Sequence, residues 1–192
     1  MDLLLAYASL SGNTRDVARR VQAQCEAAGH RVTCIHTDMQ TLHGALGDAA
    51  RAARFDLHLL GSWSDNAGRT PAEMKRYIAE LVDAAGKAIE VAAFGTGETQ
   101  WGMEYYCGAV KRIARFFDSR YPLLEIEQMP HGERDNAAIG AWCAQVLALR
   151  AASLPGAAAA TAPRAATPDP CLAARAGGAA TPVQDPMPPD PR

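Results

Sequence analysis

The stretch LAYASLSGNT, residues 5–14, runs from an apolar segment through small polar residues towards a helical pattern. Gly12 permits a tight turn, and Asn13 or Thr14 stands where a helix N-cap is expected. A helix N-terminus carries about half a positive charge and free N–H groups, which suit a phosphate. The loop adds the hydroxyls of Ser9, Ser11 and Thr14 but contains no Lys or Arg. It therefore indicates either a phosphate site built from neutral donors or a plain strand-to-helix turn capped by Asn13.

The same alternation of apolar runs and helical patterns continues along the first 150 residues. The apolar runs are LLLAYA, RVTCIHT, DLHLLGSW, AIEVAAFG and PLLEIEQMP. The helical patterns that follow them cover residues 13–29, 42–54, 70–86, 103–119 and 133–150. Strands that are each followed by a helix and joined by short loops predict an α/β protein with a parallel sheet and helices on both faces.

The composition indicates one domain and excludes several classes of partner. The chain has 192 residues, of which 48% are hydrophobic, and a formal charge of −2 from 19 basic and 21 acidic residues. This balance predicts neither a nucleic-acid-binding nor a membrane-attracting surface. No window resembles a signal peptide or a membrane span, so we expect a cytoplasmic protein. The spacing of the five Cys and five His residues predicts reduced thiols and no metal site.

The last part of the chain differs sharply from the rest. From residue 153 onward it consists mainly of Ala, Pro, Gly and Thr, with almost no large apolar side chains to bury. Such a segment cannot offset the entropy of becoming ordered. We therefore expect one ligand-binding domain over residues 1–152 and a disordered Ala/Pro-rich tail over residues 153–192.

Three of the five connections after the strands share an unusual composition. They are SLSGNT (9–14), SWSDNAGRTP (62–71) and GTGETQWG (95–102), all rich in small polar residues. Doubly wound parallel sheets bind ligands at the carboxyl ends of their strands, where the strand order reverses. The three loops therefore predict one shared site. A P-loop is excluded because no Lys follows the glycine, and GTGETQ lacks the third Gly of a dinucleotide motif.

These motifs resemble those of the short-chain flavodoxins over nearly all of residues 2–150. SLSGNT matches the family phosphate signature [TS]-x-[TS]-G-N-T, and FGTGET, Trp101 and YYCGAV resemble the third family loop. PLLEIEQMP resembles the fifth strand without the long insertion of the other flavodoxin type. The resemblance implies a flavodoxin-like doubly wound five-stranded parallel sheet of order 2-1-3-4-5 that binds FMN.

The resemblance also implies which residues hold the cofactor. The phosphate would contact the first loop, formed by Ser9, Leu10, Ser11, Gly12, Asn13 and Thr14. The isoalloxazine ring would lie between the second and third loops, against Ser62, Trp63, Ser64, Asp65, Asn66, Ala67, Gly68, Thr96, Gly97, Glu98, Thr99 and Trp101. Flat aromatic rings with polar edges need stacking faces and backbone hydrogen bonds, which such loops provide.

The second loop departs from the family pattern. Many flavodoxins place an aromatic residue where this chain has Asp65, and Trp63 comes two residues early. We therefore expect Trp101 to stack on the ring more closely than Trp63. Asn66 and Gly68 tolerate positive φ, so a peptide between them has the freedom to rotate towards the flavin. In the third loop, about two extra residues bring Met103 and Glu104 near the ring.

The flavin supplies the redox chemistry, so the protein needs no catalytic residue of its own. Carboxylates at Asp65, Glu98 and Glu104 would disfavour added negative charge on the ring, and Arg69 would offset one of them. This predicts a monomeric, low-potential one-electron carrier between a flavoprotein reductase and redox acceptor proteins. Two alternatives stay open: an activator of a ribonucleotide reductase metal centre, and an NAD(P)H-dependent quinone or flavin reductase of the same fold.

Overall fold

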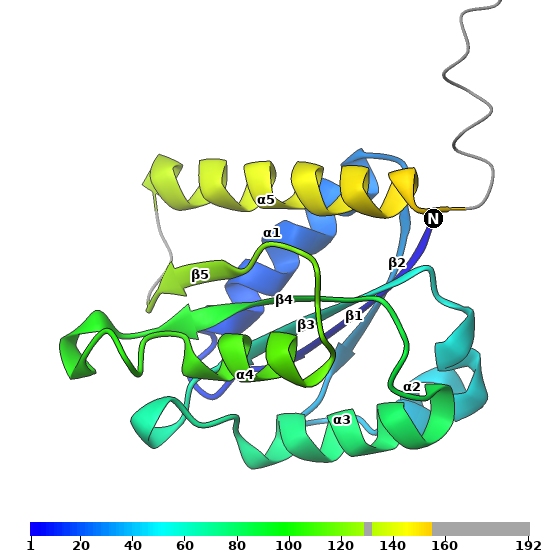
Figure 1. Cartoon of the computed structure of the whole chain (residues 1–192), viewed down its shortest axis with the longest axis horizontal. Helices are drawn as coiled ribbons and strands as arrows, with labels where there is room; N and C mark the ends of the chain where they lie inside the picture. Colours follow the sequence, from blue (N-terminus) through cyan, green and yellow to red (C-terminus); the bar gives the residue numbers. More distant parts are fainter. Residues whose placement is uncertain (129–131, 155–192) are drawn as a thin grey trace, which may run out of the picture. The chain divides into compact units, whose positions relative to one another are not determined.

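The computed structural model describes residues 1–128 and 132–154 and contains one parallel sheet (Figure 1). Its strands are β1 (Asp2–Ala8), β2 (Arg31–His36), β3 (Leu57–Trp63), β4 (Val91–Gly97) and β5 (Leu124–Glu127). They pair in the order β2-β1-β3-β4-β5, and every pairing is parallel. The predicted fold class and strand order are confirmed.

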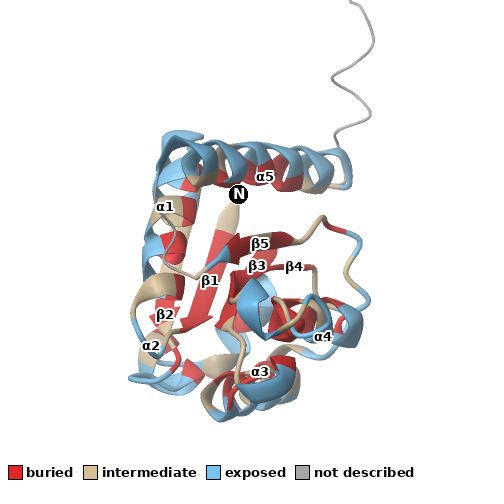
Figure 2. Cartoon of the chain, turned by 90° about the vertical axis from the view of Figure 1, so that its left-hand side faces the viewer, coloured by how far each residue is buried: buried red, intermediate tan, exposed pale blue. Residues whose placement is uncertain are grey.

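Helices cover both faces of the sheet (Figure 1). α1 (Asn13–Ala27) and α5 (Gly132–Ala152) pack on one face, and α2 (Leu42–Leu46), α3 (Ala72–Ala85) and α4 (Gly108–Phe116) pack on the other. Alternate residues of each strand point to opposite faces, so Leu3 and Leu5 of β1 join one core while Leu4 and Ala6 join the other. Figure 2 shows the buried residues on the strands and on the inner sides of the helices.

Two of the predicted helices differ from the structure. The pattern over residues 42–54 forms the short α2 and a separate 3-10 turn, η1 (Ala49–Arg54), because Gly47 adopts a φ of 72° and ends α2. The pattern over residues 103–119 becomes helical only at Gly108. Cys107 before it has a left-handed φ of 47°, which separates the preceding turn from α4.

The register of the sheet brings the three polar loops together. Ala8 at the end of β1 lies opposite Ser62, and Trp63 at the end of β3 lies opposite Thr96. β1, β3 and β4 therefore end side by side, and the loops after them start from the same edge. Two short turns belong to these loops: η2 (Asn66–Gly68) and η3 (Thr99–Trp101).

Residues 155–192 of the expected tail lie outside the described residues, and Ser153 and Leu154 follow α5 directly. In the described part of the chain, no helix combines the length and apolar character needed to cross a bilayer.

His58 near the start of β3 makes the stability of the fold depend on pH. Its ring is buried, with Nε2 3.0 Å from the carbonyl oxygen of Ala52 and Nδ1 3.3 Å from that of Glu90. Burial lowers the pKa of His58 below its ordinary value of 6.5, although the two carbonyl contacts oppose the shift. Protonation therefore favours the unfolded chain, so the free energy of unfolding should fall as the pH drops below about 6.5.

Urea unfolding at pH 7.5 and 5.5 tests this prediction. His58→Gln should reduce the loss of stability between the two pH values, because it removes the group that gains a proton on unfolding. His43→Gln, at an exposed position of α2, is the control and should leave the pH dependence unchanged. Equal pH dependence in the wild type and His58→Gln would contradict the prediction.

Candidate functional site

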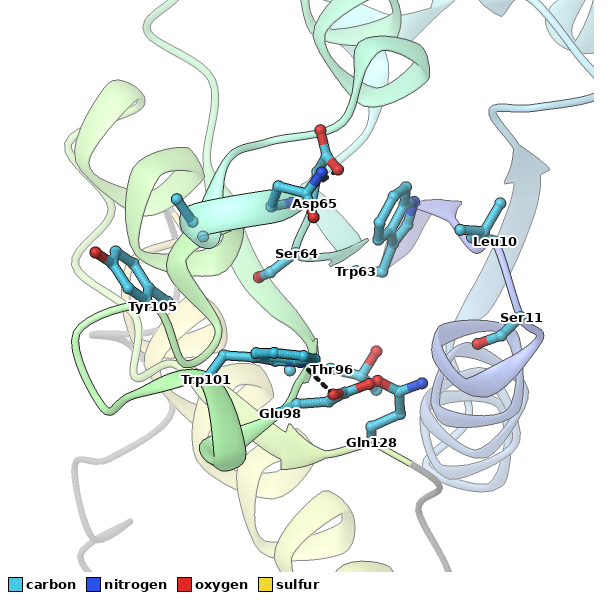
Figure 3. Close-up of a pocket in the computed structure, with 14 residues that line it drawn as sticks. Leu10, Ser11, Trp63, Ser64, Asp65, Thr96, Glu98, Trp101, Tyr105 and Gln128 are labelled. Carbon is cyan, nitrogen blue, oxygen red and sulfur yellow. Dashed lines mark hydrogen bonds between the residues drawn. The ribbon is translucent and has the colours of Figure 1, made fainter.

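A cavity of about 460 Å³ opens at the carboxyl ends of the strands, between the three polar loops (Figure 3). Ligand sites of small molecules span about 300–1,000 Å³, so its size suits a flat organic group. The lining combines aromatic rings, two carboxylates and exposed backbone. Its residues are Leu10, Ser11, Trp63, Ser64, Asp65, Asn66, Ala67, Gly68, Thr96, Gly97, Glu98, Trp101, Tyr105 and Gln128.

The first loop connects β1 to the N-terminus of α1. Gly12 is the residue that precedes the helix, with a left-handed φ of 95°, and no side chain caps the helix. The expectation that Asn13 or Thr14 would be the N-cap is therefore wrong: both lie inside α1, and the Asn13 side chain donates to Ser11 Oγ at 3.1 Å. Ser9 Oγ already accepts the N–H of Arg15 at 3.1 Å, so among the first three amides of α1 those of Asn13 and Thr14 are the ones left to bind an anion.

Thr14 joins the first loop to the fourth strand. Its side chain is buried, and its hydroxyl lies 2.9 Å from the hydroxyl of Thr96. Because each hydroxyl has one hydrogen to donate and two lone pairs to accept with, Thr14 would have to share its hydroxyl between Thr96 and any phosphate. The more exposed Ser11 also lines the cavity.

The second loop is a closed turn after β3. The backbone N–H of Asp65 donates to the carbonyl of Arg69 at 2.9 Å, and the N–H of Arg69 donates back to Asp65 at 3.0 Å. Positive φ angles occur at Ala67 (54°) and Gly68 (68°). The sequence predicted positive φ at Asn66 and Gly68. The structure has it at Gly68 and, in place of Asn66, at Ala67.

This loop is held against the beginning of α4. The Gly68 carbonyl accepts a hydrogen bond from Arg112 Nε at 3.1 Å, and Ser64 Oγ accepts one from the N–H of Ala109 at 3.2 Å. Gly108 packs so closely that a Cβ on it would lie 2.4 Å from the Gly68 oxygen. α4 thus fixes the position of the Gly68 end of the loop, while Asn66 and Ala67 stay exposed.

The two tryptophans of the site have different environments (Figure 3). Trp101 is 69% exposed, and its indole N–H donates to Glu98 at 2.5 Å. Trp63 is half-buried, packs against the core beneath α3 and donates to Glu73 at 2.9 Å. Trp101 therefore presents a free aromatic surface to the cavity, whereas much of the Trp63 side chain packs against the core.

The charges in the cavity are mainly negative. Asp65 and Glu98 line it, and Arg69 lies 3.7 Å from the Asp65 carboxylate without lining the cavity itself. Met103 and Glu104, which the sequence placed near the ring, are exposed and are not part of the lining. A ligand here would lie near the carboxylates of Asp65 and Glu98, and Arg69 partly neutralises the charge of Asp65.

Below the third loop, Cys107 and Tyr106 stay in their neutral forms at neutral pH. Burial raises the pKa of the Cys107 thiol to about 12, and its Sγ lies 3.8 Å from the Gly95 oxygen and 3.7 Å from the Ile126 oxygen. Burial also raises the pKa of Tyr106 above its ordinary value. The Cys107 thiol is therefore a structural side chain and not a nucleophile.

The structure brings most, but not all, of the predicted site residues to the cavity. Those that do not line it are Ser9, Gly12, Asn13, Thr14, Ser62 and Thr99. Ser62 is buried with its hydroxyl bonded to the Trp63 carbonyl, and the N–H of Thr99 donates to Glu127. The sequence missed Tyr105 and Gln128, which reach the cavity from the turn before α4 and from the end of β5.

A doubly wound parallel sheet, with a helix N-terminus after β1 and a cavity lined by two tryptophans at the carboxyl ends of its strands, defines the nucleotide-binding class of α/β proteins. The profile of the Flavodoxin family matches residues 5–121, and the chain belongs to this family. Probable flavodoxin 2 of Bacillus subtilis is 27% identical over 144 residues, which cover 71% of this chain and 89% of that protein.

Solved flavodoxin structures share the fold. Oxidised flavodoxin 2 from Bacillus cereus is 26% identical, with a TM-score of 0.65 over 78% of this chain and 99% of that one. A mutant flavodoxin from Fusobacterium nucleatum, solved with flavin mononucleotide bound, is 12% identical, with a TM-score of 0.61 over 77% of this chain and 96% of that one.

The residues of this chain fit FMN. The cavity offers an exposed indole for the ring, and the start of α1 offers the N–H groups of Asn13 and Thr14 for a phosphate. The chain is an FMN-binding electron carrier of the flavodoxin family.

Proposed function

We propose that this protein is a low-potential one-electron carrier that takes electrons from a flavoprotein reductase and delivers them to acceptor proteins. It works in the cytoplasm as a monomer, through one FMN-binding domain over residues 1–152. The observation that carries this proposal is the cavity between the loops, where exposed Trp101 stands beside the Glu98 carboxylate. Bound FMN would supply the redox chemistry in this cavity, and the chain supplies its environment.

Different loops would bind different parts of FMN. The first loop and the first turn of α1 would hold the phosphate, and Trp101, Trp63 and Tyr105 would exclude water from the ring. Glu98 and Asp65 would make each added electron less favourable. At an effective dielectric constant near 20, a unit charge about 8 Å away contributes roughly 2 kcal/mol before screening by salt. These contributions support a low potential.

The protein purified from its host should be yellow and release one FMN per chain when it is denatured. An anaerobic titration followed by absorbance, with a reference dye, should give a second midpoint potential well below that of free FMN, because two carboxylates line the cavity.

Each alternative has a distinct outcome. Oxidation of NAD(P)H with a quinone or free flavin, without an added reductase, would identify a reductase and contradict the carrier. Activation of a ribonucleotide reductase metal centre, with no electron delivery to other acceptors, would favour the activator. A colourless protein that does not take up added FMN would contradict all three.

A further inference from the structure

Arg15 is the first cationic side chain after the first loop, and it folds back over that loop. Its backbone N–H donates to Ser9 Oγ at 3.1 Å. Its Nη2 lies 3.0 Å, and its Cζ 3.7 Å, from the position that a Cβ would occupy on Gly12. The sequence predicted a loop with neutral donors alone. The structure instead places a guanidinium beside the backbone of that loop, in the space that Gly12 leaves open.

The guanidinium of Arg15 has no acidic partner in the described part of the chain. None of the ion pairs or side-chain hydrogen bonds over residues 1–128 and 132–154 involves it. The acid on the other side of the loop, Asp38, is already engaged: its Oδ2 accepts the N–H of Ser9 at 3.1 Å and lies 2.6 Å from His36 Nε2. The Arg15 guanidinium therefore has no carboxylate partner in the described part of the chain, whereas the Asp38 carboxylate has two partners, Ser9 and His36.

We propose that Arg15 pairs with the 5′-phosphate of FMN and gives this protein its preference for FMN over riboflavin. The proposal rests on the proposed position of the phosphate at the first loop. A guanidinium binds phosphate oxygens through paired, charge-assisted hydrogen bonds, which the neutral hydroxyls of the loop cannot supply. Riboflavin lacks the phosphate, so it gains nothing from this contact.

Titrations of apo-protein with FMN and with riboflavin, followed by flavin fluorescence, test the proposal. Arg15→Gln should weaken FMN binding about fivefold, the scale of an exposed ion pair, and riboflavin binding less than twofold. Arg15→Lys keeps the charge without the planar fork and should give an intermediate loss. Arg19→Gln is the matched control, because Arg19 is exposed one turn further along α1 and should change FMN binding less than twofold.

Salt supplies a second readout. FMN affinity of the wild type should fall between 20 and 300 mM NaCl, and the fall should be smaller for Arg15→Gln, because screening acts on the pair that this variant lacks. Equal losses of FMN and riboflavin, an unchanged FMN affinity, or the same salt dependence in both proteins would overturn the role of Arg15. A wild type that binds FMN normally while Arg15→Gln shows no effect would overturn only this inference. A wild type that binds no FMN would overturn the proposed function as well.

Discussion

Trp101→Ala is expected to weaken FMN binding by about 1–2 kcal/mol, or roughly five- to thirtyfold. The indole is 69% exposed and is held at the edge of the cavity by its hydrogen bond to Glu98. It therefore contributes contact area to a ligand and little to the core. The free energy of unfolding of the apo-protein should change by less than about 0.5 kcal/mol, because the side chain is on the surface. Fluorescence titration gives the affinity, and urea unfolding gives the stability.

Trp63→Ala is the matched comparison. It should lower the stability of the protein more than Trp101→Ala does, and weaken FMN binding less. Trp63 packs against the core and donates to Glu73, so its loss should lower the free energy of unfolding by about 2 kcal/mol and weaken FMN binding less than Trp101→Ala does. If Trp63→Ala weakens FMN binding more, the ring lies against β3 and our assignment of Trp101 is wrong. If neither variant changes FMN binding, neither indole contacts the flavin ring.

Gly108→Ala is expected to lower the free energy of unfolding by about 2 kcal/mol and to weaken FMN binding as well. A Cβ at this position would lie 2.4 Å from the Gly68 oxygen and 2.8 Å from the Gly68 Cα, both backbone atoms. Either α4 or the second loop must therefore move. Movement of the loop would displace Asp65 and Asn66, which line the cavity. Urea unfolding and FMN titration on one preparation measure both effects.

Gly140→Ala provides the control for this substitution. Gly140 lies inside α5, where the nearest side-chain atom to a new Cβ is Gln24 Oε1 at 3.9 Å. Ala has the higher helix propensity, so this variant should be more stable by up to about 1 kcal/mol and should bind FMN normally. A Gly108→Ala protein that matches the wild type in both measurements would show that the contact with Gly68 does not position the loop.

The periodicity of the sequence predicted the sheet because it depends on local patterns. Strands buried on both faces must be apolar at consecutive positions, as in LLLAYA of β1, and the helices between them must be apolar on one side. The starts of helices were less predictable. α4 begins at Gly108 because Cys107 takes a left-handed conformation, packed closely against Gly97 at the end of β4, and this contact leaves no local signal in the sequence.

The sequence predicted the sheet more completely than it predicted which side chains line the cavity. Composition identified the three loops, but a polar residue in a loop can face either a ligand or the protein interior. Ser62 and Thr14 face inwards, where the Trp63 carbonyl and the Thr96 hydroxyl satisfy them. Tyr105 and Gln128 lie outside the predicted loops, and only the packing of α4 and β5 beside β4 brings them to the cavity.

The sequence by itself determined the class of the fold, the three loops of the site and the phosphate signature SLSGNT, because these depend on residue types at short spacings. Tertiary structure decided which way each side chain of the loops points. It also braced the second loop on Gly108, since this contact depends on how closely two separate backbone segments approach. Such distances follow from the packing of the whole domain and are not encoded by any single stretch of the chain.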